Sequence, residues 1–173
     1  MHRLATVLAV AFLALAPLPV MSQTLEAIEA ADQALGAAWD ATPLAFRKVL
    51  YVSEVIGYGA YTERSGNSFR SGERIITYAE PVGYGYRSNA DGTHVLGVRV
   101  DLAIKTPGGE IVLEQKDFAS LELTSHTRNR EFMLTLTLDI TGAPVGDYVL
   151  EYLVHDLASD ETAHISTIFA IIE

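Results

Sequence analysis

The sequence PVGDYVLEYLVHD at residues 144–156, followed after a polar turn by AHISTIFAII at residues 163–172, predicts two antiparallel β-strands. Side chains alternate between the two faces of a strand, so every second residue of each segment contributes to one apolar face. A turn centred between residues 159 and 160 would place Leu150 opposite Phe169 and bring the two apolar faces together. The chain is therefore expected to end in a hairpin that is buried on one side.

Five further segments alternate between apolar and polar residues and are separated by turns rich in Gly, Pro and polar residues. With the closing hairpin they predict seven strands, lettered A, B, C, C′, E, F and G in chain order. No helical segment separates successive strands, which excludes the doubly wound and α/β-barrel enzyme folds. We expect an all-β domain over residues 44–173, a seven-stranded antiparallel sandwich in which A-B-E packs on G-F-C-C′. The five segments are residues 44–55, 72–80, 94–105, 111–118 and 132–140.

The start of the closing hairpin, Gly146-Asp147-Tyr148, resembles the corner that opens the penultimate strand of immunoglobulin-like sandwiches. The alternating strand, polar hairpin and last strand that follow are similar to the closing segment of bacterial extracytoplasmic domains of this kind. The chain thus resembles the immunoglobulin-like or fibronectin type III-like β-sandwiches of uncharacterised secreted bacterial proteins. This resemblance implies that the Tyr148 hydroxyl bonds back to the upstream backbone. It implies no activity, because the architecture carries many unrelated functions.

Residues 1–22 have the pattern of a secretory signal peptide. Met1-His2-Arg3 is basic, residues 4–21 are almost entirely apolar, and Val20-Met21-Ser22 suits cleavage after Ser22. The alternative is a membrane anchor, against which the shortness of the apolar run argues. We expect a periplasmic or secreted protein with no stable membrane insertion after cleavage. The sequence contains no Cys, so the exported domain would be held together without disulfides.

Residues 24–41 predict a helix, within an N-terminal helix and connector that covers residues 23–43. Thr24 suits the N-cap position, and Pro43 ends the segment. Apolar residues at helical spacing form a stripe along one side. This stripe is interpreted as a plug for the sandwich or as the start of the domain, and the alternatives are docking of a partner and disorder. The stripe comprises Leu25, Ile28, Ala31, Leu35, Ala38 and Trp39.

The chain is acidic, with 12 Lys and Arg residues against 22 Asp and Glu residues and a net charge of −10. Removal of residues 1–22 would take away only Arg3 among these and leave 11 basic against 22 acidic residues, or −11. Such a balance argues against nucleic acid and anionic membranes as partners. No catalytic motif, phosphate-binding glycine loop or EF-hand occurs in the sequence, so we expect no catalytic residue and no cofactor.

Two histidines of the closing hairpin are the candidate metal ligands. In the expected register His155 lies directly opposite His164, and two imidazoles on neighbouring strands can contribute to a zinc site. The competing interpretation, which we favour, is that both are polar residues near the end of a hairpin. No HExxH motif and no second pair of ligands accompanies them.

Tyrosines are concentrated in the first half of the domain, where two Gly-Tyr-Gly segments occur. Six of the eight tyrosines lie within residues 51–86. If the two segments lie side by side, four of these rings would form a platform for a sugar or an extended peptide. The alternative, which we favour, is that the glycines mark bulges and the tyrosines pack on the edge of the core. The four candidate residues are Tyr58, Tyr61, Tyr84 and Tyr86.

The sequence alone favours an exported, non-enzymatic binding module, or an envelope-associated interaction module, with a protein or glycan of the cell envelope as its ligand. One alternative is a periplasmic hydrolase whose site is assembled in space from distant residues. The other is a structural or chaperone-like protein that adds a partner's strand to an exposed sheet edge. The oligomeric state is not predicted.

Overall fold

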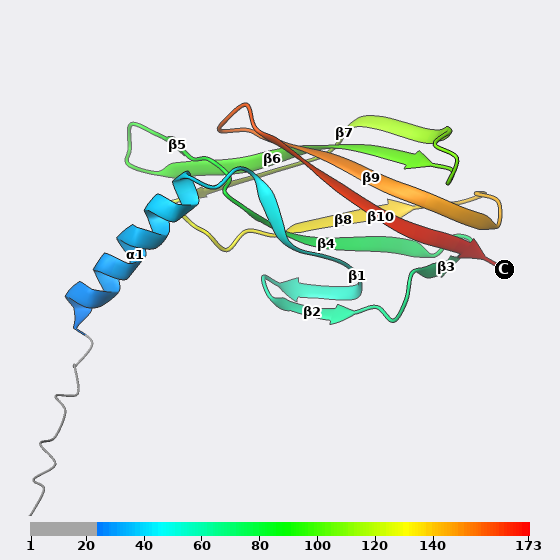
Figure 1. The fold of residues 1–173 in the computed structure, drawn as a ribbon, viewed down its shortest axis with the longest axis horizontal. Helices are drawn as coiled ribbons and strands as arrows, with labels where there is room; N and C mark the ends of the chain where they lie inside the picture. The colour runs from blue at the N-terminus through cyan, green and yellow to red at the C-terminus, as the bar shows by residue number, and fades with distance from the viewer. Residues whose placement is uncertain (1–23) are drawn as a thin grey trace, which may run out of the picture.

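The computed structural model describes residues 24–173, and the predicted signal peptide over residues 1–22 lies outside them. One helix, α1 (Leu25–Asp40), precedes ten strands (Figure 1). The prediction of a mostly β chain with one N-terminal helix and two sheets is confirmed. The strands are β1 (Ala45–Gly57), β2 (Ala60–Glu63), β3 (Ser68–Arg70), β4 (Arg74–Val82), β5 (Arg87–Ser88), β6 (His94–Lys105), β7 (Ile111–Ser125), β8 (Leu134–Asp139), β9 (Gly146–Asp156) and β10 (Thr162–Ile172).

The strands form a four-stranded sheet in the order β2-β1-β4-β8 and a six-stranded sheet in the order β3-β10-β9-β6-β5, with β7 also paired to β6. Three short strands, β2, β3 and β5, lie outside the predicted seven. The prediction of a purely antiparallel arrangement is wrong at one place, because β3 pairs with β10 in parallel. This pairing carries the chain from the first sheet to the edge of the second, and it buries Phe69 in the core.

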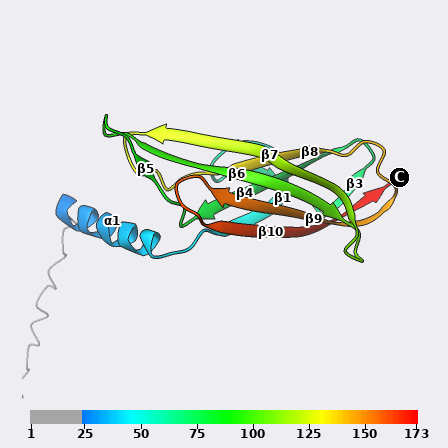
Figure 2. The ribbon, with the colours of Figure 1, turned by 90° about the horizontal axis from the view of Figure 1, so that it is seen from above.

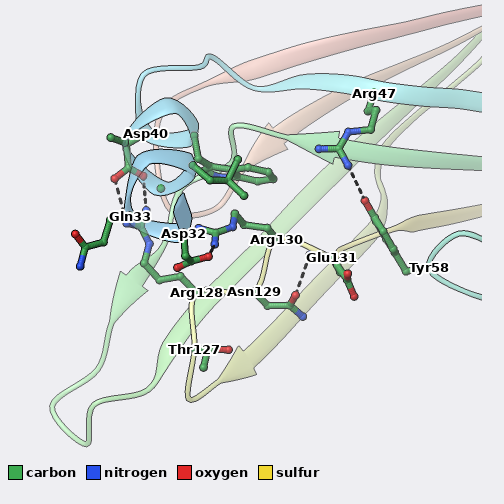
Figure 3. A pocket seen from close by; sticks show the side chains of 14 residues that line it. Asp32, Gln33, Asp40, Arg47, Tyr58, Thr127, Arg128, Asn129, Arg130 and Glu131 are labelled. Carbon is green, nitrogen blue, oxygen red and sulfur yellow. Dashed lines mark hydrogen bonds and ion pairs between the residues drawn. The ribbon is translucent and has the colours of Figure 1, made fainter. Parts of the chain in front are cut away.

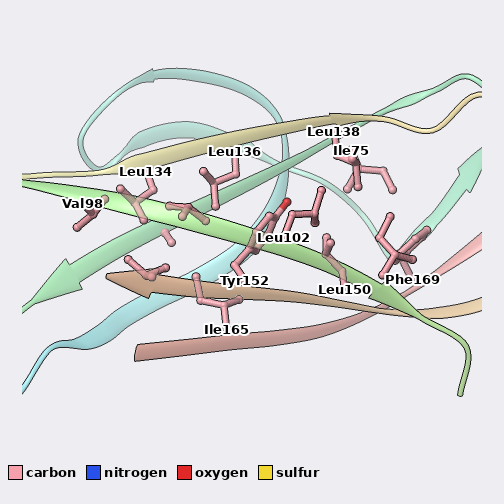
Figure 4. Packing of buried hydrophobic residues seen from close by; sticks show 14 of the residues in the cluster. Ile75, Val98, Leu102, Leu134, Leu136, Leu138, Leu150, Tyr152, Ile165 and Phe169 are labelled. Carbon is pink, nitrogen blue, oxygen red and sulfur yellow. The ribbon is translucent and has the colours of Figure 1, made fainter. Parts of the chain in front are cut away.

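The core lies between the two sheets, where the inward-facing alternate residues of both meet (Figure 4). Burial of each such aliphatic side chain contributes about 1.5–3 kcal/mol, which makes this layer the main source of stability. Buried side chains in it include Ile75 from β4, Leu134 and Leu136 from β8, Val98 and Leu102 from β6, Leu150 and Tyr152 from β9, and Ile165 and Phe169 from β10.

The closing hairpin forms as predicted, but its register differs by two residues. Leu150 faces Thr167, and Phe169 faces Tyr148. The turn is shorter than expected because the Asp156 carboxylate folds it, accepting hydrogen bonds from Ala158 N (2.9 Å) and Ser159 Oγ (2.7 Å). A shift of two residues keeps every side chain on its predicted face. The Tyr148 hydroxyl donates to the Pro144 carbonyl at 2.8 Å, the backward bond expected of this corner.

Helix α1 projects beyond one end of the sheets, as Figures 1 and 2 show. Thr24 caps it, and its hydroxyl oxygen accepts from Ala27 N at 3.4 Å. The predicted apolar stripe meets the sandwich only at Trp39, which is 6% exposed, whereas Leu25 and Ile28 are 69% and 60% exposed. The stripe as a whole therefore does not plug the sandwich. Among residues 24–173 no helix is long and apolar enough to cross a membrane.

Candidate ligand-binding cleft

Trp39 attaches α1 to the sandwich. Its indole N–H donates to the Tyr84 carbonyl at 2.9 Å, and its ring meets the Tyr84 ring edge-on with centroids 4.9 Å apart. The neighbouring Gly83 has a φ of +74°, and a Cβ there would lie 2.4 Å from the Thr42 carbonyl oxygen. Only glycine therefore allows the end of β4 to pass beneath the connector that follows α1.

Two tyrosine hydroxyls hold the segment of residues 127–131 beside the helix. Tyr84 and Tyr86 both donate to the carbonyl oxygen of Asn129, at 2.9 and 2.7 Å. Burial raises the pKa of both phenols, so they remain protonated hydrogen-bond donors near neutral pH. The Arg128 guanidinium lies over the Tyr86 ring, 4.4 Å from its centre, which is a cation–π contact.

Two arginines of this segment pair with two carboxylates of α1. Arg128 contacts both oxygens of Asp40, with Nη1 at 3.0 Å from Oδ2, and Arg130 pairs with Asp32. The hydrogen bond from Arg128 lowers the pKa of Asp40, so this pair is charged on both sides at neutral pH. The two pairs hold the C-terminal half of α1 against residues 127–131.

A cleft of about 910 Å³ lies between α1 and residues 127–131 and reaches Arg47 on β1 and Tyr58 in the β1–β2 turn (Figure 3). The Arg47 guanidinium donates to the Tyr58 hydroxyl at 3.1 Å. Within residues 24–173 no carboxylate lies within ion-pair distance of Arg47 or contacts it by a hydrogen bond. The cleft thus contains one guanidinium whose charge is unneutralised and whose remaining donors face solvent.

The charges of the cleft are divided between its two walls. The sandwich wall carries Arg47, Arg128 and Arg130 against Glu131, a net charge of +2, and the helix wall carries Asp32 and Asp40, a net charge of −2. The sandwich wall is therefore a cationic patch in an acidic chain, and the helix covers part of it with carboxylates. Such a wall can bind a carboxylate or phosphate through charge-assisted hydrogen bonds from guanidinium groups.

The four candidate tyrosines do not form one continuous platform. Tyr84 is buried beneath Trp39, and Tyr86 is half-buried beside it. Tyr58 lines the cleft next to Arg47. Tyr61 lies elsewhere, with its ring 4.5 Å from that of Tyr78 and its hydroxyl accepting from Lys48 Nζ at 2.7 Å. The structure therefore brings only some of the predicted residues to one place.

The two candidate metal ligands are not opposite one another. His155 faces Thr162, and His164 faces Leu153, because of the two-residue shift in register. His155 Nε2 instead lies 3.0 Å from Asp101 Oδ2. Among residues 24–173 no group of three or more His, Cys, Asp or Glu side chains is placed to hold a metal ion. Zinc binding by these two histidines stays a prediction.

The arginines of the cleft were not among the residues predicted from the sequence. Arg128 and Arg130 lie in a polar stretch that looks like an ordinary loop, and their partners on α1 are 88 and 98 residues away in the sequence. The feature of the sequence that could have indicated the site is the presence of two arginines, Arg128 and Arg130, in a loop between two strands of an acidic chain.

Comparison with known proteins assigns no family. No family model matches the chain, and no curated protein matches it. Among solved structures, the chain is similar to the Pseudomonas fluorescens alkylpurine DNA glycosylase AlkC bound to DNA containing an abasic site analogue. The match has 14% identity and a TM-score of 0.40, and it covers 85% of this chain but only 37% of the glycosylase chain. At this level the likeness carries no argument about activity.

These comparisons correct the predicted family and what was built on it. Membership of an immunoglobulin-like or fibronectin type III-like family of secreted bacterial proteins is not supported, because no such family matches. The exported non-enzymatic module with an envelope protein or glycan as ligand, and the exclusion of nucleic acid, find no support in any of the comparisons and are withdrawn. A tyrosine corner and alternating strands are features of β-sandwiches in general and do not identify one family. No match supports a signal peptide, and the periplasmic or secreted localisation stays a prediction.

Proposed function

We propose that the protein binds a small anionic molecule, bearing a carboxylate or phosphate group, in the cleft between α1 and residues 127–131. The observation that carries this proposal is the unneutralised guanidinium of Arg47 beside the Tyr58 hydroxyl. A guanidinium has five N–H donors in a planar fork, and Arg47 uses one of them on Tyr58, which leaves the others for a ligand. The cleft volume of about 910 Å³ suits a ligand the size of a metabolite.

The charge of the sandwich wall supports the same ligand class. Three of the 12 basic residues of the chain line this one cleft, although the chain as a whole has a net charge of −10. The Arg128 guanidinium is held over the Tyr86 ring, and the Asn129 carbonyl anchors the backbone of the segment that carries both arginines. A guanidinium that is held like that of Arg128 loses little side-chain freedom when an anion binds.

The order of the strands in the two sheets determines which segments form the walls of the cleft. We take the seven long strands as a sandwich in the order A-B-E and G-F-C-C′, with the three short strands as additions. The neighbours β1-β4-β8 and β10-β9-β6-β7 support this order. In it, residues 127–131 connect the second sheet to the first at the end where α1 lies.

The proposal is tested by calorimetric titration of the protein with citrate and, separately, inorganic pyrophosphate, at constant ionic strength. Loss of a hydrogen bond to a charged group costs about 1.5–3 kcal/mol, so Arg47→Met is expected to weaken binding by about 10- to 100-fold. Arg74→Met is the matched control, because it removes the same charge from a residue outside the cleft. Citrate and pyrophosphate distinguish carboxylate from phosphate ligands. Absence of saturable binding by both, or equal weakening by Arg47→Met and Arg74→Met, would overturn the proposal.

A further inference from the structure

The attachment of α1 depends on few contacts. Trp39 is its only buried residue, and the ion pairs Arg128–Asp40 and Arg130–Asp32 are its other links to the sandwich. A free helix of this length is only marginally stable in water, so its position depends on these links. The Asp32 and Asp40 side chains are 65% and 52% exposed, and ion pairs exposed to this extent contribute little individually.

The two carboxylates of α1 occupy the groups that an anionic ligand would use. Arg128 and Arg130 are cleft residues, and their guanidinium donors face Asp40 and Asp32 (Figure 3). A ligand anion that binds these guanidiniums competes with the helix carboxylates for the same N–H groups. The helix carries no basic residue, so a bound anion would repel the neighbouring carboxylates of Asp32 and Asp40.

We infer that anion binding in this cleft is coupled to release of α1, with Asp32 and Asp40 acting as internal competitors for Arg130 and Arg128. This inference rests on the proposed function and adds the regulation of the same site. Because the coupling is a thermodynamic linkage, a change confined to the helix carboxylates that weakens the hold on α1 strengthens ligand binding, and ligand binding weakens the hold on α1. Asp40 directly follows Trp39, so loss of the Arg128–Asp40 pair also loosens the last turn of the helix around the indole.

The coupling is measured with the full chain by titrating pyrophosphate and citrate while recording tryptophan fluorescence and, in parallel, heat. Trp39 is the only Trp of the chain and is 6% exposed, so its emission reports on the end of α1 alone. We expect each ligand that binds to shift this emission to longer wavelength. The double variant Asp32→Asn, Asp40→Asn is expected to bind the same ligand about fivefold more tightly, because the internal competitors are gone.

The matched control is the double variant Glu26→Gln, Glu29→Gln, which removes the same charge from the same helix. Neither glutamate forms an ion pair within residues 24–173. The ligand affinity of this control variant should therefore rise by less than half as much as that of Asp32→Asn, Asp40→Asn. If the titration shows saturable binding but the emission stays fixed and Asp32→Asn, Asp40→Asn binds no more tightly than the control, the coupling is overturned and the proposed function survives. If neither the heat, released or absorbed, nor the emission shows saturable binding of either ligand, the proposed function itself fails.

Discussion

The indole N–H of Trp39 donates to the carbonyl oxygen of Tyr84 at 2.9 Å, across 45 residues of sequence. This bond joins the last turn of α1 to the segment that leaves β4, and the Tyr84 hydroxyl continues the connection to Asn129. One aromatic pair therefore fixes the helix wall and the sandwich wall of the cleft relative to each other. A substitution at Trp39 should therefore alter the positions of both walls.

Replacement of Trp39 by Phe should lower the free energy of unfolding by about 1–2 kcal/mol, because it leaves the Tyr84 carbonyl without its side-chain donor while keeping an aromatic ring. Trp39→Ala removes the ring as well and should cost about 3–5 kcal/mol. Both are measured by urea unfolding followed by circular dichroism, since the fluorophore is lost. If Trp39→Phe were as stable as the parent chain, the bond would contribute nothing to the attachment of α1.

Gly83→Ala should be more destabilising than Gly92→Ala, although both glycines have left-handed backbones, with φ of +74° and +83°. An alanine in the left-handed conformation at either position lowers the free energy of unfolding by about 1–2 kcal/mol. At Gly83 the new Cβ would also lie 2.4 Å from the Thr42 carbonyl oxygen, whereas at Gly92 it would meet nothing within 4 Å. We expect a difference of about 1–3 kcal/mol in urea unfolding. Equal losses would mean that the connector moves aside freely.

Tyr148→Phe should lower the free energy of unfolding by about 1 kcal/mol, because it removes the hydroxyl that donates to the Pro144 carbonyl and leaves the ring in place. The ring stacks on Phe169 with centroids 5.3 Å apart, and this contact is retained. Thermal unfolding of the two proteins provides the measurement. No change in melting temperature would show that water replaces the hydroxyl at the corner.

The strands were predictable because alternation of apolar and polar residues is a local property of the sequence. The segment His94–Lys105 has the predicted bounds, and each residue of the closing hairpin lies on its predicted face. The hairpin register was not predictable, because it depends on how the Asp156 carboxylate folds the turn. A period of two distinguishes the faces of a strand but does not detect a shift of two residues.

The cleft was not predictable for a different reason. Its charged pairs join α1 to residues 127–131, which are distant in sequence and share no periodic pattern. Tyr58 was singled out for its glycine neighbours, and it does line the cleft, whereas Tyr84 became part of the core that supports it. Arg47 is one polar position of an alternating strand, and nothing local in the sequence shows that its guanidinium lacks a carboxylate partner.

A buried charge lies on the outer face of β6, away from the cleft. Asp101 is only 7% exposed, and its carboxylate accepts hydrogen bonds from Asp117 N (3.0 Å), Lys116 Nζ (3.2 Å) and His155 Nε2 (3.0 Å). Burial acts to raise the pKa of Asp101, but these donors outweigh it and hold the pKa at about 2, below the ordinary value of 3.8. Asp117 has a φ of +51°, a conformation that turns its N–H towards this carboxylate.

Asp101→Asn should therefore make the free energy of unfolding depend less on pH below about pH 4. A carboxylate whose pKa is lowered on folding stabilises the protein above its unfolded pKa, and this contribution is lost as the pH falls from about 4 to about 2. The shift corresponds to about 2 kcal/mol, so the variant should be less stable by that amount at pH 7 and should approach the parent chain near pH 2. Urea unfolding of the variant and the parent chain at a series of pH values measures this difference.

The control is Asp117→Asn, which keeps the backbone donor, loses only an exposed pair with Arg99, and should change the free energy of unfolding by less than about 1 kcal/mol at any pH. Parallel profiles for Asp101→Asn and the parent chain would show that the charge of Asp101 does not stabilise the fold.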